Sequence, residues 1–239
     1  ETTSQRDFYD LAVGNVPFGN YKVNDKAYNN LGFSIHNYFF AKALDQVRPG
    51  GVVAFVTSRF TMDSKDSTAR KYLAQRADLL GVVRLPNDAF KANAGTEVVS
   101  DILFLQKLER PIDREPEWVQ VGQTPEGFTV NQYFVDHPNM VLGTLSAEST
   151  QYGREDVTVD PIEGADLAEQ LKEATAKIQG RYVAAEIAET ELDEGAPDVL
   201  PADPSVKNFS YTVVEGEVYY RENSVMNPVE LSGDAKERV

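Results

Sequence analysis

Apolar runs separated by helix-like or polar segments constrain the fold of this chain more than any other feature. Four of them are rich in Val, Leu, Ile and Phe, as buried strands are: residues 8–16, 52–58, 79–86 and 100–108. Residues 34–47 place apolar side chains at the spacing of an amphipathic helix, which Pro49-Gly50-Gly51 is expected to stop. Residues 66–77 predict a second helix, with Asp66 or Ser67 near its N-cap. Strands that alternate with helices predict an α/β sheet with helical crossovers.

The last two apolar runs are separated by 13 residues without a helical pattern, so they predict an antiparallel pair. Beyond them, residues 115–134 predict a hairpin or loop pair around Trp118 and Phe128. One long helical stretch, or two broken at Gly180, is expected over residues 161–189. A Pro- and Asp-rich linker and a last hairpin with Glu215-Gly216 at its turn complete the chain, at residues 193–206 and 211–220.

Charge divides the chain into two parts. Residues 1–110 hold 14 Lys+Arg and 12 Asp+Glu, a net +2, and the remainder holds 9 and 26, a net −17, which together give −15. We therefore expect a catalytic region over 1–110, because phosphate binding depends on Lys and Arg. Residues 111–239 are expected to form an acidic α+β extension that serves target recognition or joins domains.

Residue counts exclude several classes of site. The chain has no cysteine and two histidines, His36 and His137, so thiolate chemistry is excluded and no metal site is expected. No apolar run reaches 18 residues and no signal sequence is present, so neither a membrane partner nor secretion is expected. We expect a reducing, cytoplasmic setting. Because the first residue is Glu1 and not Met, the sequence reads as part of a longer protein.

The segment that carries chemistry is Asn15-Val16-Pro17-Phe18, directly after the first predicted strand. Open α/β sheets bind ligands at the carboxyl ends of their strands. A strand-capping turn is the plain structural alternative for these four residues. The four residues resemble the (D/N/S)-P-P-(Y/F/W) motif of the amino-methyltransferases, which methylate an exocyclic amine. Such an amine, for example adenine N6, is a poor nucleophile because its lone pair is delocalised into the ring. The resemblance implies that two hydrogen-bond acceptors aimed at the amine localise that lone pair, and that an aromatic ring beside them stacks on the base.

The amino-methyltransferases use S-adenosyl-L-methionine, so the resemblance implies this cofactor. The order of NVPFG, the FSIHNYFFAKAL helix, RPGGVVAFVTS and GVVRLPNDAF…DILFLQK resembles the second half of N6-adenine DNA methyltransferases. NVPFGNYKV with NQYFVDHPNMVLG is most similar to the methylase part of helicase–methyltransferase fusion proteins of phages and mobile elements. The resemblance implies the C-terminal half of a Rossmann-like class I methyltransferase sheet, ordered β-α-β-α-β-β.

The resemblance also implies roles for single residues. The Asn15 side-chain oxygen and the Val16 carbonyl would accept from the amine, Pro17 would stiffen the loop and Phe18 would stack on a flipped base. The family usually has Pro where this chain has Val16. The difference puts the rigidity of the loop in doubt, but the backbone carbonyl at this position is present with either residue. Further substrate contacts are expected from Gly19, Tyr21, Lys22 and Phe90, although a solvated loop explains Tyr21 and Lys22 equally well.

The family's glycine-rich cofactor motif is absent here, since only 14 residues precede Asn15. The main cofactor pocket is therefore expected upstream of Glu1, with Asn15 and Pro17 at its border. The fragment alone is expected to be inactive. Expected partners are DNA and the rest of the parent polypeptide, namely the N-terminal half of the methylase and a possible helicase, in a restriction-modification setting.

Several residues and functions keep two interpretations. A stripe of basic side chains would face phosphate or lie on a solvated helix face: Arg59, Arg70, Lys71, Arg76 and Arg84. Phe39 and Phe40 are expected in the core, His36 at a surface or cap position, and Trp118, Tyr133 and Phe134 in a small core of their own. Methylation of a protein glutamine side chain, or a non-catalytic scaffold role, are the alternatives to DNA methylation.

Overall fold

The computed structural model describes residues 5–19, 23–91, 95, 97–149, 155–181, 183, 200–203, 205–207, 209–222 and 225–229. The chain divides into two compact units, Glu1–Ala185 and Glu186–Val239. This boundary differs from the change in composition after Arg110, because residues that follow Arg110 pack onto the main sheet. No helix in the described part of the chain is long and apolar enough to cross a membrane.

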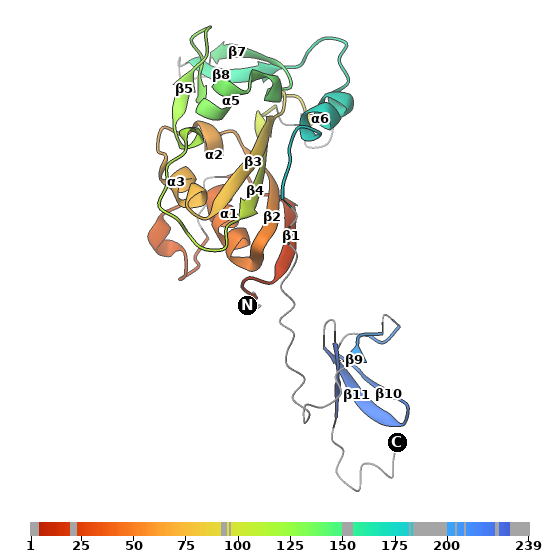
Figure 1. Cartoon of the computed structure of the whole chain (residues 1–239). Coiled ribbons are helices and arrows are strands. Elements are labelled where there is room, and N and C mark those ends of the chain that lie inside the picture. Colours follow the sequence, from red (N-terminus) through yellow and green to blue (C-terminus); the bar gives the residue numbers. More distant parts are fainter. Residues whose placement is uncertain are drawn as a thin grey trace. The chain divides into compact units, whose positions relative to one another are not determined.

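The first unit is built on a mixed four-stranded sheet (Figure 1). Its strands are β1 (Tyr9–Asn15), β2 (Val47–Ser58), β3 (Ala77–Arg84) and β4 (Ser100–Lys107), in the order β1-β2-β4-β3. β1 and β2 are parallel, whereas β4 is antiparallel to both β2 and β3. The predicted α/β class and the antiparallel pairing of the last two strands are therefore confirmed.

Three helices occupy the crossovers: α1 (Ile35–Gln46), α2 (Phe60–Asp63) and α3 (Thr68–Ala74), with a 3₁₀ turn η1 (Asn29–Leu31) before them. The prediction that Pro49-Gly50-Gly51 ends the first helix was wrong. α1 ends at Gln46 because Val47 already has extended backbone angles and begins β2. β2 accommodates the proline and glycines by an irregular register against β1, between Tyr9 and Leu11. Ser67 is the N-cap of α3, and the carboxylate of Asp66 directly before it accepts from the Thr68 backbone N–H at 2.9 Å.

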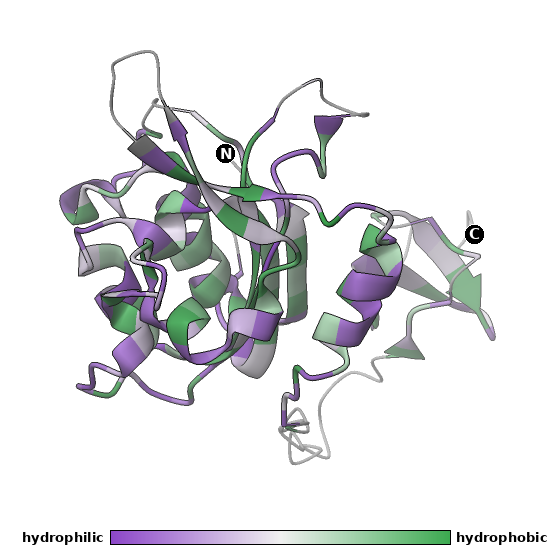
Figure 2. Ribbon diagram, turned by 90° about the horizontal axis from the view of Figure 1, so that it is seen from above, coloured by the Kyte–Doolittle hydropathy of each residue, from purple (hydrophilic) through white to green (hydrophobic). Residues whose placement is uncertain are grey.

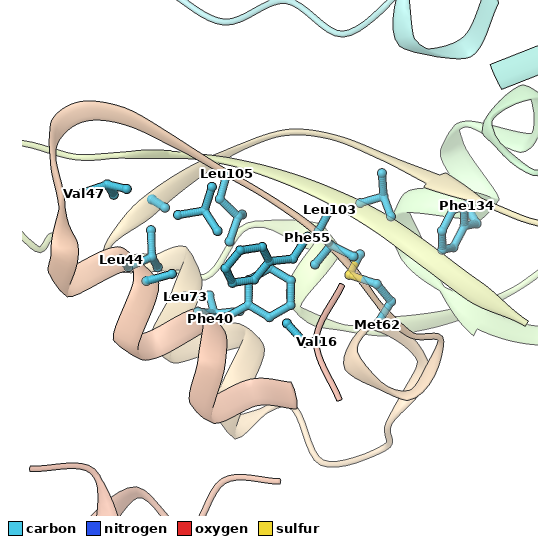
Figure 3. Close-up of a cluster of buried hydrophobic side chains, with 14 of the residues drawn as sticks. Val16, Phe40, Leu44, Val47, Phe55, Met62, Leu73, Leu103, Leu105 and Phe134 are labelled. Atoms are coloured by element: carbon cyan, nitrogen blue, oxygen red, sulfur yellow. The ribbon is translucent and has the colours of Figure 1, made fainter. Parts of the chain in front are cut away.

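The main core lies between this sheet and helices α1 and α3. Figure 3 shows its centre, where Phe40 and Phe55 have ring centroids 5.2 Å apart and Leu103 and Leu105 come from β4. Figure 2 shows hydrophobic residues, drawn green, in both the helices and the strands. The prediction that Phe40 belongs to the core is confirmed, and Phe39 packs at its margin. Burial of these large side chains is the main force that stabilises the unit.

Residues after Arg110 form small elements that pack against the sheet. They are η2 (Glu117–Val119), β5 (Val121–Gln123), β6 (Thr129–Asn131), α5 (Gln132–Asp136), η3 (Pro138–Met140), β7 (Thr144–Ser149), β8 (Glu155–Asp160) and α6 (Leu167–Thr175). β5 and β6 form the predicted hairpin. Phe134 is buried in the main core with Trp118 and Tyr133 at its margin, so the expectation of a separate small core was wrong.

The expected long helix over residues 161–189 is reduced to α6, which ends at Thr175. Residues 176–181 are not helical, because they are held against the sheet instead. The Gln106 side chain accepts from the Arg181 amide at 3.1 Å and donates to the Gly50 carbonyl at 2.9 Å. A Cβ at Gly81 would lie 2.8 Å from Ile178, so only glycine lets this segment approach β3 closely. The last part of the predicted helix lies outside the described residues.

The second unit contains a small antiparallel sheet of β9 (Leu200–Pro201), β10 (Tyr211–Val214), β11 (Glu217–Glu222) and β12 (Val225–Pro228), in the order β10-β11-β12-β9. β10 and β11 form the predicted hairpin. Glu215 and Gly216 both have positive φ angles at its turn, 53° and 86°. Most of the predicted linker over residues 193–206 lies outside the described residues.

Candidate active site

The carboxyl ends of β1, β2 and β3 meet at one edge of the sheet, at Asn15, Ser58 and Arg84. Asn15 pairs in register with Val56 of β2, two residues before that strand ends. The loop that follows Asn15 and helix α2 that follows Ser58 are therefore neighbours. This edge is where open α/β sheets hold ligands.

Val16 fastens the loop to the sheet in two ways. Its backbone N–H donates to the Val56 carbonyl at 3.0 Å, which extends the pairing with β2 one residue beyond β1. Its side chain is only 5% exposed and lies in the main core beside Phe40 and Met62 (Figure 3). A proline at this position would lack the N–H. Valine therefore supplies by hydrogen bonding and burial a rigidity that proline would supply by its ring.

Asn15 has the opposite orientation to Val16, because successive side chains of an extended strand point to opposite faces. Val16 is buried and Asn15 is exposed, as are Leu11 and Val13 on the same face of β1. Among the described residues, neither the Asn15 side-chain oxygen nor the Val16 carbonyl accepts a hydrogen bond. Two acceptors on consecutive residues at the strand end thus have no donor among the residues that the structure describes.

The remaining residues of the predicted site are distributed unevenly. Pro17 is half-buried, Phe18 is 42% exposed and Gly19 is exposed, so the aromatic ring is accessible next to Asn15. Phe90 instead packs against a second core cluster around Val83, Leu85, Met140 and Leu142. Tyr21 and Lys22 lie outside the described residues.

The segment that follows the loop is fixed onto helix α1. The Asp25 carboxylate accepts from Tyr38 Oη at 2.9 Å and from Lys42 Nζ at 3.0 Å. Tyr28 Oη donates to Asp45 at 2.6 Å, and burial, followed by this carboxylate, raises the pKa of Tyr28 above its ordinary value. These contacts fix the far end of the loop, as Val16 fixes its near end.

Three residues of the predicted basic stripe are buried. For these three, both the phosphate-facing and the solvated interpretation were wrong. Arg70 is 1% exposed and donates to the carbonyls of Val119, Thr61 and Ser64 at 2.7, 3.2 and 2.7 Å. Arg84 is completely buried and Arg59 is 8% exposed. Their charges are used inside the protein to join elements and are not presented to a ligand.

Arg84 is the centre of a buried ion cluster below the carboxyl edge. Its guanidinium donates to both oxygens of Asp101 at 2.8 Å and to Asp63 at 2.7 Å, and lies 4.1 Å from the Phe134 ring centroid. Burial alone would lower the pKa of Arg84, but the two carboxylates outweigh it and raise the pKa above its ordinary value. Asp63 also accepts a hydrogen bond from the backbone N–H of Asn131 at 2.9 Å. The cluster therefore holds α2 against β3, β4 and β6.

Phe60 is a surface aromatic that the sequence analysis missed. It is the first residue of α2, two positions beyond the end of β2, and is 53% exposed. The Arg59 guanidinium stacks 4.3 Å from its ring centroid and is itself paired with Asp63 and Asp156. Its position after a buried strand, like that of Phe18 after β1, is the sequence pattern that would have revealed it.

Comparison with known proteins gives partial matches. No protein-family model matches the chain. Over 112 residues it is 35% identical to the defense against restriction protein B of Escherichia phage P1, a match that covers 44% of this chain and 5% of that protein.

Among solved structures, a putative class I S-adenosylmethionine-dependent methyltransferase from Listeria monocytogenes is similar at 22% identity and a TM-score of 0.35, covering 46% of this chain and 34% of that one. A modification subunit of a putative type I restriction enzyme from Vibrio vulnificus is similar at 19% identity and a TM-score of 0.35, covering 64% of this chain and 37% of that one. The chain thus spans well under half the length of each of these proteins.

Proposed function

We propose that this chain carries the amine-activating loop of an S-adenosyl-L-methionine-dependent DNA methyltransferase that acts on adenine N6. The observation that carries the proposal is a pair of acceptors at the carboxyl end of β1 to which no described residue donates, on a loop held by the Val16 amide and side chain. Acceptors fixed in advance at the position of developing charge need no reorganisation during the reaction. Both N–H groups of the amine would donate hydrogen bonds, one to Asn15 Oδ1 and one to the Val16 carbonyl.

The chain's own residues would each perform one task. Asn15 and Val16 localise the amine lone pair toward the methyl group, and Phe18 stacks on the base beside them. Pro17 limits the backbone freedom between acceptor and platform. S-adenosyl-L-methionine would supply the methyl group, and Asn15 and Pro17 would lie at the border of its site.

The edge of β1 supports a further part of the proposal, that this unit is completed by another part of the parent protein. Among the described residues, β1 pairs only with β2, and Leu11 and Val13 are 56% and 70% exposed. An apolar strand with an open edge is a site for pairing with another strand. The small share of the phage P1 protein that this chain matches is consistent with one segment of a large polypeptide. We propose that the completing part holds most of the cofactor site.

The experiment compares tritiated methyl transfer from S-adenosyl-L-methionine by this chain and by the parent protein, with unmethylated duplex DNA as acceptor. We expect label in N6-methyladenine from the parent protein and none from this chain alone. An untreated protein lysate as acceptor is the matched control for transfer to glutamine side chains.

Two outcomes contradict the proposal. Label in protein and not in DNA would assign the loop to glutamine methylation, which uses the same acceptor chemistry. Binding of neither cofactor nor DNA by the parent protein would leave a scaffold role for the unit.

A further inference from the structure

One pocket is lined by no residue of the Asn15–Phe18 loop and is not used by the proposed reaction. It lies between the chain that leads into α1 and the two helices after β2, and has a volume of about 260 Å³. Its lining comes from Leu31, Gly32, Phe33, Ser34, His36, Asn37, Phe60, Ser64, Asp66, Thr68 and Ala69. Pockets for small molecules begin at about 300 Å³. This volume therefore suits a single heterocycle better than a larger ligand.

Two aromatic side chains form walls of the pocket. Phe33 is fixed by an edge-to-face contact with Tyr72, at a centroid distance of 5.4 Å. The Arg59 guanidinium lies over the Phe60 ring. Phe60 is nevertheless more than half exposed, so part of its surface remains available to a planar ligand. Stacking on such rings tolerates any base, because every base has a π-face.

Unsatisfied polar groups gather at the same place. In the described part of the chain, four buried side-chain polar atoms have no hydrogen-bond partner, and three of them belong to lining residues: Ser34 Oγ, His36 Nδ1 and Asn37 Oδ1. Such atoms cost free energy when unpaired, so a cluster of them requires an explanation. No hydrogen bond to a described residue fixes either the His36 ring or the Asn37 amide. Both can turn toward a ligand without breaking one.

The charge of the pocket lining disfavours an anion such as phosphate as the bound group. The pocket lining contains one carboxylate, that of Asp66. Hydrogen bonds from the Thr68 hydroxyl and backbone N–H lower the pKa of Asp66, so this carboxylate is ionised at neutral pH. Burial lowers the pKa of His36, so its ring is neutral and offers no positive charge. A neutral heterocycle with donors and acceptors on its edge fits this lining, whereas an anion does not.

We propose that this pocket receives a second nucleobase of the DNA substrate, other than the base that stacks on Phe18. The inference rests on the proposed function for its nucleic-acid substrate. Phe60 and Phe33 would hold the base by stacking. Asn37, His36 and Ser34, whose unpaired polar atoms are buried in this conformation, would turn to bind its polar edge. The pocket is thereby a specificity site for a base other than the one that is methylated.

The test uses the two histidines as reporters in the complete chain. The ring signals of His36 and His137 are recorded by NMR while a single-stranded pentadeoxynucleotide is added. His137 is the internal control, because its ring stacks on Tyr133 away from the pocket, at 4.4 Å between centroids. The same pentanucleotide with an abasic centre tests for phosphate, and S-adenosylhomocysteine tests for the adenine ring of the cofactor.

We expect His36 and not His137 to shift with the base-containing strand, and the abasic strand to have little effect. Phe60→Ala should weaken this binding roughly 5- to 100-fold, since stacking on one aromatic ring is commonly of that size. Phe60→Tyr should restore it, which separates stacking from folding. An unchanged affinity in Phe60→Ala, an equal shift with the abasic strand, or a shift with S-adenosylhomocysteine alone would each overturn the assignment.

The two proposals can fail separately. A base-dependent His36 shift without methyl transfer by the parent protein keeps the pocket and removes the reaction. Methyl transfer to DNA without any shift of His36 keeps the reaction and removes the pocket.

Discussion

Replacement of Val16 by proline tests how the loop is held, because it introduces the residue that the amino-methyltransferase motif usually has at this position. The Val16 N–H donates to the Val56 carbonyl at 3.0 Å, and a proline has no N–H to donate. The pyrrolidine ring is also apolar and of similar size, so most of the core contact is retained. The substitution therefore removes mainly the backbone hydrogen bond.

The expected loss of stability follows from the hydrogen bond. A protein hydrogen bond contributes about 0.5–1.5 kcal/mol, and a carbonyl left without a partner costs about 1–3 kcal/mol. We expect Val16→Pro to lower the free energy of unfolding of the first unit by about 1–3 kcal/mol. Urea unfolding followed by the fluorescence of Trp118, the one tryptophan, measures this directly because its ring packs against the main core.

Val16→Ala is the matched control, since it keeps the N–H and removes two buried methyl groups. It should cost about 1.5–3 kcal/mol by loss of apolar burial and cavity formation. A Val16→Pro variant as stable as the wild type, with Val16→Ala destabilised, would show that the amide does not hold the loop. The account of how valine replaces proline would then be refuted.

Three further predictions concern the interior and the surface of the site. Asp101→Asn should lower the free energy of unfolding, measured in urea, by about 3–5 kcal/mol, because the buried Arg84 loses one of its two carboxylate partners. As the control, Asp78→Asn at a half-exposed ion pair should lower it by less than about 1 kcal/mol. Burial lowers the pKa of His36 in the folded state, so the unfolded chain binds a proton at this residue more readily. The free energy of unfolding should therefore fall as the pH decreases through about 6.5, and His36→Gln should reduce that fall in acid unfolding. An unchanged pH profile in His36→Gln would contradict this role of His36. Phe18→Ala should leave the free energy of unfolding nearly unchanged, because the ring is 42% exposed. It should reduce the rate of methyl transfer by the parent protein roughly 5- to 100-fold. An unchanged rate would contradict the role of Phe18 as the stacking platform.

Much of the sheet was predictable because its strands are apolar and short. The runs that contain Leu11, Val53, Val82 and Leu103 all became strands of one sheet, and the absence of a helix between the last two correctly predicted their antiparallel pairing. The insertion of β4 between β2 and β3 was not predictable from periodicity. It is visible only in the pairing of β4 with both β2 and β3.

Charged residues mark the limit of sequence reasoning here. Arg84 and Asp101 lie 17 positions apart, so their pairing becomes visible only when β3 and β4 are aligned. Arg70 is satisfied entirely by backbone carbonyls, which have no sequence signature. The helical composition around Gly180 likewise gave way to the hydrogen bonds between Gln106 and Arg181, because tertiary contacts override local propensity.

The central claim is that Asn15 activates an exocyclic amine. The most direct test is the single-turnover rate of methyl transfer to DNA by Asn15→Ala in the parent protein, with cofactor affinity measured in parallel. Loss of one acceptor of this kind costs about 10²–10³ in rate, so we expect a fall of that size with cofactor affinity nearly unchanged. A variant that keeps more than about a tenth of the wild-type rate would contradict the role assigned to Asn15.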